Sequence, residues 1–181
     1  MAAIFDDIMA KEKKLGWYFE DYLFRISPHN LFIGCALDAN PRVVEKNGIT
    51  AVVSMCHCES ELERQKYPIP IFKYPVEDKK PGVFEMLYYL QMFTAATKKV
   101  VELVKNGDAV LLHCAGGLSR SVIVGILAIA VLENLSADDA YVRMATLRPY
   151  HIGWLHRGLF DAIKNQVIAR LCGNGAMESI K

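Results

Sequence analysis

The sequence predicts an α/β fold, in which a central, mainly parallel sheet of four to five strands is flanked by helices on both faces. Short apolar runs typical of buried strands alternate along the chain with longer segments that favour helices. Strands that alternate with helices favour a parallel sheet whose two faces are both covered. The chain has 181 residues, 52% of them hydrophobic, which is enough for one domain with a substantial core.

The strands and helices can be assigned in order along the chain. Predicted strands lie at residues 30–33, 49–55, 71–74 and 109–113. Predicted helices lie at residues 39–47, 83–106, 121–133, 136–147 and 156–171. The apolar run from Val122 to Leu132 predicts a buried helix. Ser136 is a typical helix N-cap, because the acidic residues Asp138 and Asp139 follow it in the first turn.

Residues 23–171 form one predicted domain with an extension at each end. Residues 1–22 predict an N-terminal helical extension, because apolar residues there recur on one helical face, at Ile4, Phe5, Ile8 and Met9. We expect this extension to pack on the domain; a dimer contact and a flap over the functional site are the alternatives. The sequence Gly173-Asn174-Gly175 predicts a flexible tail over residues 172–181.

Residues 112–121, Leu-His-Cys-Ala-Gly-Gly-Leu-Ser-Arg-Ser, are the most informative part of the chain. A strand, a tight loop and a helix follow one another here, so loop N–H groups point inward and the helix dipole adds positive potential. Arg120 adds a planar guanidinium that binds a phosphoryl group through paired hydrogen bonds. Cys114 lies at the base of this cradle, where the same field favours a thiolate. Such a site is suited to moving a phosphoryl group onto sulfur.

This stretch resembles the signature of the cysteine-dependent protein phosphatases, specifically the small, atypical type of the dual-specificity branch. That signature is His-Cys, five residues, Arg, then Ser or Thr, and all of it is present. The resemblance covers roughly residues 23–171 and implies the phosphatase-like α/β fold. One departure follows Arg148-Pro149: the family often has Pro-Asn that supports the phosphate loop, and this chain has Gly153-Trp154.

The resemblance implies a role for each residue of the motif. Cys114 is the expected nucleophile, and Arg120 is expected to bind the phosphoryl oxygens and stabilise the transition state. Ser121 is placed to donate a hydrogen bond to the cysteine sulfur and ease its departure, and His113 is expected to orient the loop. The backbone N–H groups that complete the substrate-binding cradle belong to Ala115, Gly116, Gly117, Leu118, Ser119 and Arg120.

Asp78 is the predicted general acid. Displacing an alkoxide or phenoxide from phosphorus requires a proton for the leaving oxygen, and a carboxylic acid can supply it. Asp78 follows the strand predicted at residues 71–74, and ligands of parallel sheets bind at loops after the carboxyl ends of strands. The matching aspartate of the family acts first as acid and then as base. Glu77 is the alternative acid.

The five cysteines, an odd number without regular spacing, argue against a disulfide-stapled secreted domain. Residues 48–56 resemble a stretch of the phosphatases of regenerating liver, where the cysteine at this position pairs with the catalytic one. This resemblance makes Cys56 a predicted redox partner of Cys114. Cys58 is the alternative partner, and a small buried hydrophobic residue is the alternative role for Cys56.

We expect no metal and no cofactor. Cys56-His57-Cys58 is a tight cluster of soft ligands, and His151 and His156 are also present. A zinc site would need a fourth well-placed ligand and more usual spacing. Arg120 and the helix end are sufficient to neutralise the phosphate charge.

The expected function is hydrolysis of phosphate monoesters on proteins, at phosphotyrosine and phosphoserine or phosphothreonine, through a phosphocysteine intermediate. A phosphoinositide or RNA 5′-phosphatase is the first alternative, but the loop lacks the lysines typical of lipid phosphatases. A non-catalytic phosphosite-binding module is the second, but such relatives typically lose the cysteine or the acid, and both are retained here.

Composition limits the partners. The formal net charge of +1 argues against nucleic acid. The chain's first residues lack the features of a signal peptide, and its longest apolar run is too short to span a bilayer. We therefore expect a phosphorylated protein as substrate, no membrane partner, and a monomer or weak homodimer in the cytoplasm or nucleus.

Overall fold

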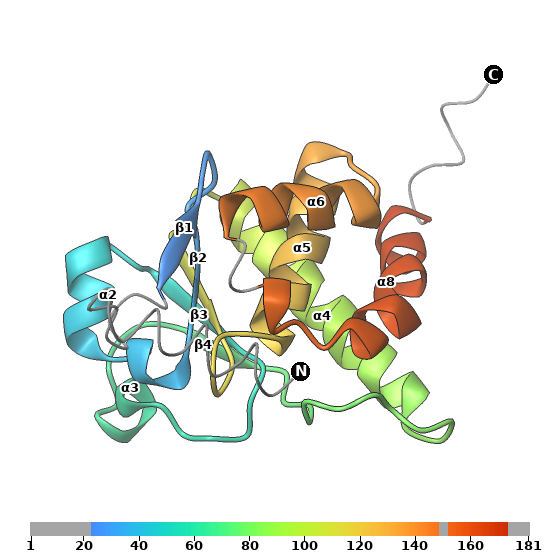
Figure 1. Cartoon of the computed structure of the whole chain (residues 1–181). Coiled ribbons are helices and arrows are strands. Elements are labelled where there is room, and N and C mark those ends of the chain that lie inside the picture. Colours follow the sequence, from blue (N-terminus) through green and yellow to red (C-terminus); the bar gives the residue numbers. More distant parts are fainter. Residues whose placement is uncertain (1–22, 149–151, 174–181) are drawn as a thin grey trace, which may run out of the picture.

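The computed structural model describes residues 23–148 and 152–173, and in this part of the chain five strands form one sheet (Figure 1). The strand order across the sheet is β1-β2-β5-β3-β4. Strand β1 pairs antiparallel with β2, and all other neighbours are parallel. The predicted mainly parallel sheet is therefore confirmed. The strands are β1 (Phe24–Ile26), β2 (Leu31–Gly34), β3 (Ala51–Ser54), β4 (Ile71–Lys73) and β5 (Val110–His113).

Helices cover both faces of the sheet, as predicted (Figure 1). Two short helices, α2 (Pro41–Asn47) and α3 (Glu61–Arg64), lie on one side, where a 3-10 turn, η2 (Ala36–Asp38), follows β2. The other side carries the longer helices, which are α4 (Met86–Lys105), α5 (Arg120–Glu133), α6 (Ala137–Leu147) and α8 (Arg157–Cys172).

Two clusters of buried apolar side chains hold these layers together. Along β5, Val110 and Leu112 belong to the cluster beneath the long helices, whereas Leu111 belongs to the cluster beneath α2 and α3. Successive side chains of a strand point to opposite faces, so a strand covered on both sides is apolar at every position. This is why the central strands stand out in the sequence as unbroken apolar runs.

Helix α5 lies at the centre of the helical layer and is buried along ten consecutive residues, from Ser121 to Ala130. It packs against α4, α6, α8 and the sheet. Gly125 lies so close to β2 that a Cβ at this position would be 2.4 Å from the Ile33 Cδ1 atom. Helix α5 therefore packs closely against β2 at Gly125.

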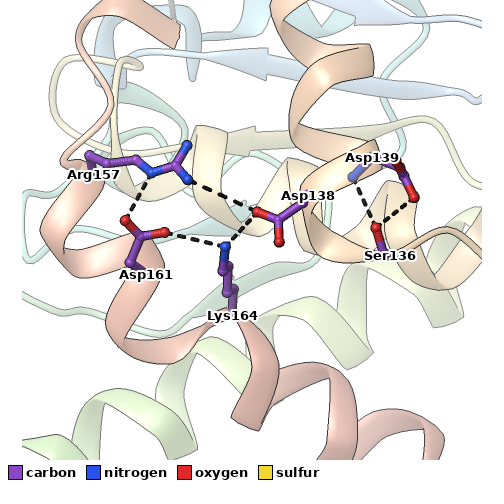
Figure 2. A network of polar contacts seen from close by, with 6 residues as sticks. All are labelled: Ser136, Asp138, Asp139, Arg157, Asp161 and Lys164. Carbon is purple, nitrogen blue, oxygen red and sulfur yellow. Dashed lines mark hydrogen bonds and ion pairs between the residues drawn. The ribbon is translucent and has the colours of Figure 1, made fainter.

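Helix α8 is joined to α6 by ion pairs at the surface (Figure 2). Lys164 pairs with Asp138 of α6 and with Asp161 of its own helix, and Arg157 pairs with Asp161 at 2.9 Å. Exposed pairs of this kind contribute little free energy individually. The predicted N-cap of α6 is confirmed, because the Ser136 hydroxyl accepts a hydrogen bond from the backbone N–H of Asp139 at 3.0 Å.

Element boundaries differ slightly from the sequence prediction. Helix α4 begins at Met86, three residues later than predicted, because the backbone N–H groups of Glu85 and Met86 both donate to the Gly82 carbonyl in a turn. Helix α8 continues to Cys172, one residue into the predicted tail. The predicted extension at residues 1–22 and the rest of the tail lie outside the described residues.

Among the described residues no single helix is both long and apolar enough to cross a bilayer. Helices α5 and α6 meet that test only as a pair, and they are bent by 115° at their junction.

Phe93 offers a test of the core. It is 0% exposed on α4, inside the cluster beneath the long helices. Phe93→Ala should lower the free energy of unfolding by about 3–5 kcal/mol, because it removes buried apolar surface and leaves a cavity. Urea denaturation measures this, with Leu147→Ala, at a 43% exposed position, as the control. A loss below about 1 kcal/mol at Phe93 would contradict the packing described here.

Candidate active site

The motif residues 114–119 form a loop at the middle of the sheet's carboxyl edge. Strand β5, which leads into the loop, has β2 on one side and β3 on the other. The loop ends at Ser119, and α5 begins at Arg120, as the strand–loop–helix prediction requires. Within the cradle, Ala115 and Gly116 are exposed, Leu118 is half-buried, and Gly117 and Ser119 are buried.

The loop rests on the backbone that follows β2. Gly117 has a φ of +70°, and a Cβ there would lie 2.8 Å from the Gly34 carbonyl atoms and 2.9 Å from the Cys35 nitrogen. One residue farther on, the Ala36 N–H donates to the Ala115 carbonyl at 3.1 Å. Only glycine meets both the positive φ and the close approach at position 117.

A buried carboxylate holds the segment on which the loop rests. Asp38 accepts a hydrogen bond from the Cys35 N–H at 2.7 Å, and its Oδ2 atom would be 2.6 Å from a Cβ at Gly34. Burial raises the pKa of Asp38. Burial and the Asp38 charge also raise the pKa of the Cys35 thiol to about 11, so this thiol is neutral at pH 7. The sequence analysis did not identify Asp38 as a site residue.

Cys114 lies at the floor of the loop and is 1% exposed. The Ser121 hydroxyl, which is fully buried in the first turn of α5, donates to the Cys114 sulfur at 3.4 Å. The structure therefore places Ser121 where the sequence analysis expected it, beside the sulfur that would leave in a second chemical step.

Arg120 is held by the loop that follows β4. Its Nη1 atom donates to the Val76 carbonyl at 2.9 Å, and its side chain is 11% exposed. Its Nε atom lies 3.6 Å from Asp78 Oδ2 and has no hydrogen-bond partner within the part of the chain that the structure describes. The guanidinium is thus fixed at one nitrogen, and its Nε faces the Asp78 carboxyl group.

Asp78, and not Glu77, reaches the loop. Its Oδ1 atom accepts a hydrogen bond from the Ser119 hydroxyl at 2.7 Å, and 35% of its side chain is exposed. Glu77 pairs with Lys79 at 3.0 Å and is 67% exposed. The geometry supports the choice of Asp78 over the alternative acid.

Ser119 has a side-chain function that sequence reasoning missed. Besides donating to Asp78, its hydroxyl accepts a hydrogen bond from the His156 backbone N–H at 3.2 Å. This bond ties the loop to the segment after Gly153-Trp154, where the family's Pro-Asn is absent. The sequence signal for this function is the hydroxyl group of Ser119 next to Arg120, whereas the sequence analysis gives Ser119 only a backbone N–H in the cradle.

His113 lies beneath the loop on the face covered by α2 and α3, and it is 0% exposed. Burial lowers its pKa to about 4, so the ring is neutral at pH 7. Its Nδ1 atom lies 3.3 Å from the Cys114 carbonyl, and the neutral ring donates there. The arrangement supports an orienting role and not one as a proton carrier.

Cys56 follows β3 and is 2% exposed, with its sulfur 3.7 Å from the Ser54 hydroxyl. Burial and the neighbouring Cys58 raise the pKa of this thiol to about 11. Ser54 pairs with His113 in the sheet, which shows that Cys56 and Cys114 end neighbouring strands. Cys114 and Val53 belong to the cluster beneath the long helices, whereas Ser54, the residue after Val53, alternates to the other face of the sheet, and its hydroxyl lies beside Cys56. The redox role of Cys56 stays a prediction.

Among the described residues, no group of three or more His, Cys, Asp and Glu side chains could hold a metal ion. Cys58 is exposed and Cys56 is buried. His151, which was considered as a ligand, lies outside the described residues.

Comparison with known proteins matches this geometry to a family. The family profile described as dual specificity phosphatase, catalytic domain, matches residues 31–153, which is more than half of the chain. The chain belongs to this family. The resemblance seen in the sequence is thereby confirmed.

Individual relatives agree with the family match. Dual specificity protein phosphatase 14 of Mus musculus is 30% identical over 124 residues, which cover 66% of this chain and 58% of that protein. Dual specificity protein phosphatase 6 of Homo sapiens is 30% identical over 112 residues, or 61% of this chain and 28% of that protein. The chain thus spans less than two thirds of the length of either relative.

The fold is also shared with a solved structure of the family. The crystal structure of human DUSP28 has a TM-score of 0.63 at 23% identity, covering 82% of this chain and 94% of that chain.

Gly117 offers a test of the loop geometry. Gly117→Ala should lower kcat/KM toward a small aryl phosphate by about tenfold or more, because the Cβ meets backbone atoms and the positive φ costs about 1–2 kcal/mol. Gly116→Ala is the matched control, since a Cβ there has nothing within 4 Å. Equal losses in the two variants would contradict the assigned contact with β2.

His113 offers a test of the pH dependence of stability. The unfolded chain, in which the pKa of His113 returns to 6.5, binds this proton more readily than the folded chain. Stability should therefore fall as the pH drops from about 6.5 toward 4, with a slope from this residue of up to about 1.4 kcal/mol per pH unit. Urea denaturation of wild type and His113→Asn at several pH values measures the difference. Parallel curves would refute the buried neutral ring.

Proposed function

We propose that the chain hydrolyses phosphate monoesters on proteins, at phosphotyrosine and at phosphoserine or phosphothreonine, through a phosphocysteine intermediate. One observation carries the proposal. The loop after β4 brings Asp78 and the Val76 carbonyl onto the Ser119–Arg120 end of the phosphate loop, at 2.7 and 2.9 Å. A proton donor, an anion-binding guanidinium and a cysteine nucleophile thus share one site.

In the first step the Cys114 thiolate attacks phosphorus, so that an S–P bond forms and the P–O bond to the leaving group breaks. Arg120 and the N–H groups of residues 115–120 stabilise the charge that develops on the phosphoryl oxygens. Protonated Asp78 gives its proton to the leaving oxygen. The hydrogen bond from Ser119 keeps the carboxyl group at the edge of the cradle.

In the second step the Asp78 carboxylate accepts a proton from a water molecule, whose oxygen attacks phosphorus. The S–P bond breaks and the electron pair returns to the Cys114 sulfur. The Ser121 hydroxyl, 3.4 Å from that sulfur, stabilises the leaving thiolate. Inorganic phosphate leaves, and the site returns to its starting protonation state.

A protein substrate is favoured over a phosphoinositide or an RNA 5′ end. The five residues between Cys114 and Arg120 carry no basic side chain, so the cradle has no added charge for a polyanionic headgroup. The two curated relatives are named protein phosphatases. Retention of both Cys114 and Asp78 favours an enzyme over a binding module.

Cys114→Ser should abolish turnover of p-nitrophenyl phosphate and leave binding of a phosphopeptide largely intact, because the cradle consists of backbone groups and Arg120. Steady-state kinetics and fluorescence anisotropy measure the two properties. Residual activity above a few per cent of wild type would rule out Cys114 as the nucleophile. Cys35→Ser, a substitution at another buried cysteine, serves as the matched control and should remain active.

Asp78→Ala should lower kcat by about 10²-fold or more, because it removes a positioned acid. The loss should be smaller for aryl phosphates with good leaving groups, which need less protonation. Glu77→Ala is the matched control and should keep activity near wild type. If Glu77→Ala instead shows the leaving-group dependence, Asp78 is not the general acid.

A further inference from the structure

Four exposed apolar side chains gather where the loop after β4 enters α4. Val83 is 89% exposed, Phe84 100%, Leu87 58% and Tyr88 44%. They make up four of the seven large hydrophobic side chains that are exposed among the described residues. Residues three and four apart in a helical turn share a face, so these four form one surface, here named the apolar patch. Exposed apolar surface of this kind marks a site of interaction.

A turn anchored by Glu85 holds the tip of the patch. The two carboxylate oxygens of Glu85 pair with Lys79 at 2.8 Å and accept from the Gly82 N–H at 3.0 Å. The Glu85 N–H in turn donates to the Gly82 carbonyl at 3.1 Å. Val83 and Phe84 therefore stand at the tip of a fixed turn and not on a loose loop.

Two tyrosines of α4 join the patch to the loop that carries Asp78. Tyr88 donates from its hydroxyl to the Pro75 carbonyl at 2.6 Å, and Tyr89 donates to the Glu77 carbonyl at 3.0 Å. That loop also holds Arg120 and Ser119, so the patch and the phosphate cradle both contact the same loop.

The distance from the cradle to the patch is short enough for one peptide segment to span. Val83 follows Asp78 by five residues, and an extended chain covers at most about 3.6 Å per residue, so the two lie within about 18 Å. Between them Lys80 is exposed and makes no ion pair with any residue that the structure describes. Its ammonium group offers a positive charge two residues along the chain from Asp78.

We propose that the apolar patch binds an apolar side chain of the phosphorylated substrate protein, located within about five residues of the phosphorylated residue. Lys80 attracts an acidic residue of the same segment. The substrate class is thus an acidic, phosphorylated segment with a nearby apolar anchor. The inference rests on the proposed function. It adds that the apolar patch determines which phosphorylated proteins the site accepts. The loop shared with the cradle and the charge of Lys80 favour a substrate segment over a second copy of this chain.

The test compares pairs of acidic phosphotyrosine peptides. The two peptides of a pair differ only in having Leu or Ser at one position, three to five residues from the phosphotyrosine. In one series this position precedes the phosphotyrosine, and in the other it follows. Wild type should show kcat/KM about tenfold higher for the Leu peptide of one series, as expected for burial of one apolar side chain. The double variant Val83→Ser, Phe84→Ser should reduce that ratio to near one, while p-nitrophenyl phosphate, which is too small to reach the patch, is turned over at the wild-type rate.

Val142→Ser is the matched control, because Val142 is a 61% exposed apolar residue on α6, and it should keep the wild-type ratio. A ratio near one in wild type for both series, or an unchanged ratio in the double variant, overturns the inference. Sedimentation velocity compares the oligomeric state of wild type and the double variant. If wild type is a dimer, the double variant is a monomer and the Leu-to-Ser ratio of kcat/KM is unchanged, the patch binds a second copy and the inference fails.

A failure of the proposed function is distinguishable from a failure of this inference. If wild type turns over neither p-nitrophenyl phosphate nor any peptide, the proposed catalysis fails. Fluorescence anisotropy of the same peptides with Cys114→Ser then tests the patch directly. Tighter binding of the Leu peptide, lost when the patch substitutions are added, supports the patch, and equal binding of both peptides overturns it.

Discussion

The contact between Gly117 and the backbone at Gly34 and Cys35 is the constraint on which the site depends. A Cβ at position 117 would lie 2.8 Å from the Gly34 carbonyl atoms and 2.9 Å from the Cys35 nitrogen. The loop after β5 and the backbone after β2 are therefore in direct contact. The buried Asp38 carboxylate fixes the backbone after β2 through the Cys35 N–H. The phosphate loop is therefore shaped by the end of β2 as much as by its own sequence.

A second set of contacts closes the site from the other side. Asp78 and the Val76 carbonyl hold the hydroxyl of Ser119 and the guanidinium of Arg120, and the His156 N–H reaches the same hydroxyl. Three regions far apart in the sequence thus meet at the first turn of α5. Because α5 is buried along most of its length, it is a rigid base for these groups. Preorganised donors of this kind need no reorganisation during the reaction.

Much of the fold followed from local signals, because strands covered on both faces and the buried helix α5 are apolar without interruption. The three-residue elements β1, with the sequence Phe-Arg-Ile, and η2, with the sequence Ala-Leu-Asp, were not predicted, because neither forms an unbroken apolar run. Helix α3 was missed although Ser60 and Glu63 form a capping box, a recognisable start signal.

Within the site, the motif identified the groups expected to bind phosphate but not the contacts that hold these groups in place. The resemblance favoured Asp78 over the neighbouring Glu77, and the path of the loop after β4 shows that the Asp78 carboxyl group is the one that contacts Ser119. The contact of Ser119 with the His156 N–H depends on chain segments 37 residues apart, which no local pattern records. The Asp38 carboxylate can lie against Gly34 only because glycine has no side chain, and this contact is not visible in the sequence. The face of the sheet on which Cys56 lies depends on the register of β3 with β5.

The strand order has a consequence for how the chain folds during its synthesis. Strand β5 pairs with both β2 and β3, which do not pair with each other. Until residue 113 has left the ribosome, the nascent chain therefore lacks the strand that pairs with the edges of β2 and β3, and these two apolar edges have no partner. Such edges are prone to pair with other chains. The strand that leads into Cys114 is thus also the one that joins the two halves of the sheet and removes this hazard.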